Sequence, residues 1–278
     1  MREAPARVKS ASLRTHVTPA SVAQYVTSLR GLAGALRIHL RLYATHFYHA
    51  FQIVVLPGAI AALAVLVLRS QGATGYFHVL MGAGLIGIWT ALVGTSMFTM
   101  LRERLWFGTF EMLTGFPVRL PAIYAGYLLA EALVALVAVP VAFGMGLLLL
   151  GRVPFGPPLP VVAALLVATV ALSAMAMLLA ALVLLAPGLL NWQPGLQHSV
   201  WIACGFLVPV ALLPGWSMWA GAALPAYWAG RALDAAAAGQ GMLSPVGAAL
   251  GLSAAYVLAS VLLFQAVGAR FRRDGAPA

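Results

Sequence analysis

Long apolar stretches dominate this sequence. Several of them reach the roughly 20 residues that a helix needs to cross a bilayer. Only 8% of the 278 residues are charged, whereas a soluble domain carries about a quarter. The stretches lack the strict alternation of a membrane β-barrel. We therefore expect an all-α integral membrane protein, a bundle of helices that satisfy their own backbone hydrogen bonds within the bilayer.

Six transmembrane helices are predicted, at residues 49–68, 77–100, 122–150, 159–185, 196–213 and 246–269. They form one domain over residues 26–273, between a flexible cytoplasmic tail at 1–25 and a short tail at 274–278. Residues 214–245 contain too many breaks for a span and too many aromatic residues for free solvent. Because Trp and Tyr concentrate at bilayer interfaces, we expect short helices there, at the outer face.

The basic residues indicate how the chain is oriented. Of 16 Lys and Arg residues, seven precede residue 45, three lie between residues 102 and 119, and three end the chain. Basic flanks mark the cytoplasmic side, so both termini are predicted to be cytoplasmic. The net charge of +10 then reflects topology and not nucleic-acid binding. The heavy use of Arg, Ala, Gly and Pro favours a bacterial source, and hence the bacterial cytoplasmic (inner) membrane.

An amphipathic helix is predicted before the first span. Apolar residues recur there three or four positions apart, at Leu29, Leu32, Leu36, Leu40, Tyr43 and Phe47. Arg30, Arg37 and Arg41 share a different face. Such a helix lies in the membrane surface with its arginines toward anionic headgroups. The alternative is a solvated cytoplasmic helix.

One charged island lies between the second and third predicted spans. It begins at Arg102, Glu103 and Arg104, continues to Glu111, and closes at Pro117 and Arg119. These charges cannot lie in hydrocarbon, so we expect a short structured cytoplasmic loop. Its apolar side chains either insert into a groove of another protein or cover the ends of neighbouring spans; they are Trp106, Phe107, Phe110, Leu113 and Phe116.

The sequence offers little for catalysis. It has six acidic residues, and no catalytic cluster or metal site is expected among them. Only Glu131 lies clearly within a span, where it could line a translocation path or hold a proton. Alternatively, water or an arginine reaches it near the cytoplasmic end of its helix. A P-loop is excluded because the only lysine, Lys9, precedes the first glycine, Gly31.

Two stretches resemble the permease subunits of ABC-type (type 2) exporters of drugs, antibiotics, polysaccharides and lipids. In the island the resemblance rests on Gly108, Thr109, Phe110, Glu111 and Leu113, followed by Pro117 and Arg119. A later stretch is also similar, at Gly205–Pro209, Leu213–Trp216 and Leu224–Pro225. Phe110 stands where the family commonly has leucine, and two additional residues separate Arg104 from Gly108.

The resemblance implies a half-transporter without its own ATPase site or cofactor. Two copies of a separate ABC-type ATPase subunit, carrying ATP and Mg, would dock on a coupling helix in the island. A second permease copy completes the pathway, a homodimer being favoured over a heterodimer, among membrane lipids. Gly205, Pro209, Pro214 and Pro225 would belong to the translocation path or gate, and the segment 214–245 would help form the outer gate. The alternatives are a proton-coupled secondary transporter using Glu131, a lipid or polysaccharide exporter, and a membrane enzyme or scaffold.

Overall fold

The computed structural model describes residues 19–43, 51–72, 75–105, 120–153, 156–208, 212 and 215–274. Within these ranges every regular element is a helix and there is no strand, which confirms the all-α prediction. Five stretches are long and apolar enough to cross a membrane: Phe51–Ser70, Tyr76–Gly94, Leu120–Leu150, Pro158–Leu185 and Leu243–Arg270.

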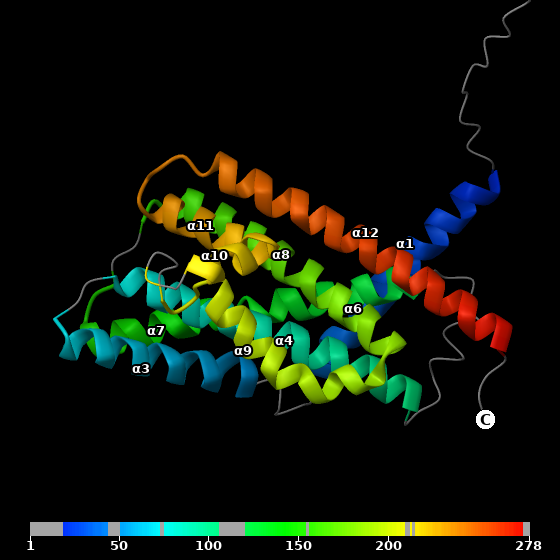
Figure 1. The fold of residues 1–278 in the computed structure, drawn as a ribbon, viewed down its shortest axis with the longest axis horizontal. Helices are drawn as coiled ribbons and strands as arrows, with labels where there is room; N and C mark the ends of the chain where they lie inside the picture. The colour runs from blue at the N-terminus through cyan, green and yellow to red at the C-terminus, as the bar shows by residue number, and fades with distance from the viewer. Residues whose placement is uncertain are drawn as a thin grey trace, which may run out of the picture.

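The long helices lie side by side along one axis of the bundle (Figure 1). In chain order they are α1 (Pro19–Tyr43), η1 (Phe51–Val55), α3 (Leu56–Ser70), α4 (Tyr76–Leu105), α6 (Leu120–Ala135), α7 (Ala138–Leu150), α8 (Pro158–Leu185), η2 (Pro187–Trp192), α9 (Gln193–Ala203), α10 (Gly215–Ala222), α11 (Pro225–Ala237) and α12 (Leu243–Asp274).

The bundle has two distinct ends. At one end α4 finishes, α6 begins, α12 finishes and α1 lies alongside (Figure 1); we call it the Leu105 end. Residues 71–72, 151–153 and 238–242 lie at the other end, which we call the Gly72 end. Charged segments that the sequence placed on one side of the membrane, the end of α4 and the end of α12, therefore share the Leu105 end.

Helix α4 is the central element. Every residue from Val79 to Gly94 is buried, and α3, α6, α7, α8 and α9 all pack against it. Glycines let these neighbours approach closely. A Cβ atom at Gly87 would lie 2.6 Å from the Cβ of Ala138 and 3.0 Å from Cγ of Pro57. At Gly82 it would overlap the carbonyl oxygen of Phe206.

Prolines interrupt two of the spans. Pro140 has no N–H to donate to Leu136, four residues earlier, and the helix tightens into a turn at 136–137 that separates α6 from α7. In the first span Pro57 cannot bond to Ile53 in the same way. The preceding residues form a π-helix, η1, which buries Gln52 against Gly94. The distortion of the helix thus lies in the turn before Pro57.

The fifth predicted helix, 196–213, is wrong in its bounds. The helix α9 begins at Gln193 and ends at Ala203. Gly205 follows with φ of 69°, a left-handed conformation that glycine adopts without strain and that stops the helix. At 6 and 11 residues, η2 and α9 together only reach the lower limit of the roughly 17–25 residues with which a helix crosses a bilayer. The short helices expected before the last span are present as α10 and α11, and α11 packs between α8 and α12.

Helix α1 packs along α6, with Leu32 and Leu36 of the predicted apolar face half-buried at the contact. Ala35 and His39 are buried, and a Cβ at Gly126 would lie 2.5 Å from the carbonyl oxygen of Leu32. Leu29 and Leu40, assigned to the apolar face, are 66% and 39% exposed. Because Gly126 has no side chain, the face of α1 that carries the small Ala35 can approach α6 closely. The spacing of the leucines in α1 does not reveal this contact.

The contact between Gly82 and Phe206 can be tested by adding one methyl group. We expect Gly82→Ala to lower the free energy of unfolding by roughly 1–3 kcal/mol, because backbone must shift to accommodate the methyl. Gly144→Ala is the matched control, since it lies in α7 with no atom within 4 Å of its Cβ position. Thermal unfolding in detergent compares the two. Equal midpoints would contradict the close contact of the 204–206 turn with α4.

Candidate functional site

The charged island lies mostly beyond what the structure describes. Arg102, Glu103 and Arg104 belong to the last two turns of α4, and only their backbone is described. The remaining residues predicted to contact an ATPase lie outside the described ranges; they are Gly108, Thr109, Phe110, Glu111, Leu113, Pro117 and Arg119.

The two helices that flank the island are both anchored in the bundle. Helix α4 is central, and α6 packs against α1, α4, α8 and α12. The first residue of α6, Leu120, is already buried. A displacement of residues 106–119 would therefore act on two helices that share a packed core, and such cores respond as rigid bodies.

Glu131 forms a buried pair with a residue that the sequence analysis did not single out. Its carboxyl Oε2 lies 3.6 Å from Nε2 of His39 on α1. Glu131 is 1% exposed and His39 is 6% exposed. The His39 ring stacks on Tyr127 with centroids 4.9 Å apart. A buried carboxylate is expensive without a partner, and this arrangement supplies one from another helix.

Aromatic rings extend this pair into the bundle. Tyr127 meets Tyr124 edge to face, with centroids 5.9 Å apart, and Tyr124 stacks on Phe264 of α12 at 5.1 Å. Helices α1, α6 and α12 are thus joined by one run of rings. A titratable pair next to aromatic side chains can hold a proton or accept a cation by charge and ring-face attraction.

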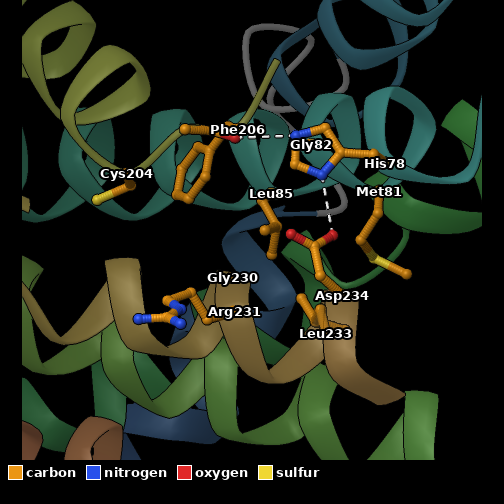
Figure 2. A pocket seen from close by; sticks show the side chains of 11 residues that line it. His78, Met81, Gly82, Leu85, Cys204, Phe206, Gly230, Arg231, Leu233 and Asp234 are labelled. Carbon is orange, nitrogen blue, oxygen red and sulfur yellow. Dashed lines mark hydrogen bonds and ion pairs between the residues drawn. The ribbon is translucent and has the colours of Figure 1, made fainter. Parts of the chain in front are cut away.

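A second polar cluster surrounds the turn after α9, near the Gly72 end (Figure 2). His78 on α4 places Nδ1 2.9 Å from Oδ1 of Asp234 on α11. Its Nε2 lies 3.0 Å from the carbonyl oxygen of Gly205. One histidine thereby joins α4, α11 and the turn. The pocket between them has a cavity volume of about 20 Å³, room for one water molecule and too small for an organic substrate.

Cys204 and Arg231 line the same pocket. Cys204 is 3% exposed, and burial raises the pKa of its thiol. The guanidinium carbon of Arg231 lies 5.5 Å from the centroid of the Trp228 ring. Figure 2 shows this guanidinium directed away from His78 and Asp234.

The remaining predicted site residues are distributed as follows. Gly205 forms the turn, and Pro225 begins α11, whereas Pro209 and Pro214 lie outside the described residues. Arg30, Arg37 and Arg41 are exposed on α1. Glu131 contacts α1, whereas Gly205 contacts the first turns of α4, so the structure does not join them into one site. His39 meets Glu131, and His78 meets Asp234, across large sequence separations. No local sequence pattern could reveal either pair.

In the part of the chain that the structure describes, no group of three or more His, Cys, Asp or Glu side chains could hold a metal ion. No protein-family model matches this chain, and a search of curated proteins found no match.

The pairing of His39 with Glu131 predicts non-additive mutations. Removing either partner leaves a buried polar group behind, so His39→Ala and Glu131→Ala should each destabilise the protein by about 3–5 kcal/mol. The double variant should lose less than the sum, with a coupling free energy of about 0.5–3 kcal/mol. Chemical unfolding in detergent measures the cycle. The control is the cycle of His198→Ala and Glu131→Ala, two residues on different helices, whose losses of stability should add. If the losses for His39→Ala and Glu131→Ala also added strictly, the contact between His39 and Glu131 would be refuted.

Proposed function

We propose that this chain is the permease subunit of an ATP-driven exporter of the ABC type. In this proposal it is a half-transporter: two copies form the pathway, and two separate ATPase subunits, with ATP and Mg, dock on the loop at residues 102–119. The permease itself has no ATPase site. The proposal draws on the resemblance of Gly108–Leu113 and of Gly205–Pro225 to that family.

Six membrane passes belong to this proposal, with η2 and α9 as a short fifth pass that α10 and α11 complete. The charge distribution supports it. Helix α1 and the end of α12, which carries Arg270, lie at the Leu105 end (Figure 1). Arg69 is in the last turn of α3 and Arg152 is in the segment 151–153, so both belong to the Gly72 end. The basic excess at the Leu105 end favours its placement in the cytoplasm of a bacterium, with both termini there.

The observation that carries the proposal is the anchoring of the island between α4 and α6. A docked ATPase would push on residues joined directly to the most buried helix of the bundle. Motion from nucleotide binding would then reach the pathway through packed helices with discrete arrangements. An exposed loop attached to peripheral helices would transmit far less of this motion to the pathway.

The cargo is proposed to be hydrophobic or amphiphilic, as drugs and antibiotics are. The spans expose many leucine and valine side chains, and the buried polar residues are few. A hydrated polysaccharide would need a pathway rich in hydrogen-bonding groups. A lipid remains compatible with the same surface and is the closest alternative cargo.

A proton-coupled secondary transporter is the second candidate, because the buried pair of His39 and Glu131 could carry a proton. The two mechanisms differ in their energy source. In the ATP-driven mechanism, export of a fluorescent amphiphile from cells stops when ATP is depleted and continues when the proton gradient is collapsed. In the proton-driven mechanism the two treatments have the opposite effects, and Glu131→Gln abolishes export.

Substitutions in the island test the docking role. Phe110→Ala and Glu111→Ala should abolish cargo-stimulated ATP hydrolysis by the complex purified from its native membranes, because they remove the surface that the ATPase grips. Membrane insertion and yield should stay unchanged. The control is Arg152→Ala, an exposed residue near the Gly72 end, which should retain stimulation. Full stimulation in both island variants would count against the proposal.

A further inference from the structure

Both ring nitrogens of His78 face hydrogen-bond acceptors. A carbonyl oxygen can only accept, so Nε2 must carry the proton in the 3.0 Å bond to Gly205. An ionised carboxylate also only accepts, so Nδ1 must carry a proton in the 2.9 Å contact with Asp234. A neutral imidazole has one N–H and cannot satisfy both. The arrangement therefore fits a doubly protonated imidazolium beside an ionised Asp234.

We propose that His78 is a proton-binding site whose occupancy holds the turn Cys204–Phe206 and helix α11 against α4. With the proton bound, His78 donates to the turn through Nε2 and to α11 through Nδ1. Release of that proton leaves a nitrogen lone pair opposite an acceptor, and one of the two bonds is lost. The ligand of this site is a single proton, exchanged near the Gly72 end of the bundle.

The loss would loosen the contact without unfolding the bundle. The turn still rests on α4 at Gly82, where the absence of a side chain lets the Phe206 carbonyl approach, and α11 still packs against α8 and α12. The change is confined to elements that meet at His78. Access is available, because the Asp234 side chain is 51% exposed and that of His78 is 20% exposed.

Other ionisable groups of the described chain lie around His78. Asp234 and Arg231 face the pocket from α11, and Cys204 faces it from the turn. From α12, the Tyr256 hydroxyl donates to the carbonyl oxygen of Ala223, 3.1 Å away. Imidazole is the side chain whose charge ordinarily changes between about pH 5 and pH 8, and substitution of His78 separates it from these other groups.

This inference stands apart from the proposed transport function, since it uses only the geometry around His78. Cys204 provides the reporter, because it is the only cysteine in the chain, is adjacent to Gly205, and is buried. The experiment measures the rate at which N-ethylmaleimide labels Cys204 in the full-length protein in detergent, from about pH 5.5 to about pH 8.5. Division by the rate for the denatured chain at the same pH removes the pH dependence of thiol chemistry itself.

The expected result is protection that falls as the pH rises through the titration of His78, by roughly tenfold, the effect of losing one charge-assisted hydrogen bond. Only the doubly protonated form of His78 makes both hydrogen bonds. Both bonds are therefore present at low pH, and one of them is lost as the pH rises. His78→Gln should remove the pH dependence, because glutamine does not titrate.

Asp234→Asn tests whether the loss of the hydrogen bond at Nδ1 causes the fall in protection. The asparagine amide can donate to Nδ1 of a neutral imidazole while Nε2–H still donates to Gly205. Protection should then be independent of pH and, at about pH 8.5, higher than in the unmodified protein. His198→Gln is the matched control, since that exposed histidine bonds to Pro194 within α9, and it should leave the fall in protection unchanged.

Two outcomes would overturn the inference. Protection of Cys204 that does not change with pH in the unmodified protein would show that the turn is held without the proton. If the fall in protection persisted in His78→Gln, a group other than His78 would be its cause. Because Gln and Asn are close in size to the residues they replace, folding is checked by the unfolding midpoint of each variant at the lowest pH.

Discussion

Close backbone contact around α4 is the constraint on which the rest of this structure depends. Within hydrocarbon, helices gain little from burying apolar side chains against one another, so association relies on packing and hydrogen bonds. Gly82, Gly87 and Gly94 open the surface of α4 to a turn, to α3 with α7, and to Gln52 of the π-helix. Every residue of α4 from Val79 to Gly94 is buried as a result, and α3, α6, α7, α8 and α9 all pack against it.

Two pairs of ionisable residues in the described part of the chain perform a related task. The pair of His39 and Glu131 fixes α1 to α6, the helix that follows the charged island. The pair of His78 and Asp234 fixes α11 to α4 at the opposite end. Charged groups are costly at membrane depth and persist where they join segments or serve function. The first pair joins α1 to α6, the helix that follows the island, and the second joins α11 to α4, the helix that precedes it.

The sequence predicted what depends on local composition and missed what depends on distant contacts. Apolar runs located the fourth span within one residue of α8, and breaks in pattern located the short helices before α12. The fifth helix was drawn too long, because the apolar residues beyond Cys204 hide the left-handed Gly205 that ends it. The packing of α1 on α6 was not predicted, since it depends on Gly126 of another helix. His78 and Asp234 are 156 residues apart, and neither has a local pattern that indicates a partner.

The central claim is that the loop containing Thr109 faces the cytoplasm, where an ATPase can reach it. Its most direct test is the labelling of single cysteines in a Cys204→Ser background with a membrane-impermeant maleimide. Thr109→Cys should react in inverted membrane vesicles and remain unlabelled in intact cells, whereas Gln240→Cys, exposed at the Gly72 end, should react from outside intact cells. Labelling of Thr109→Cys from outside intact cells would contradict the account.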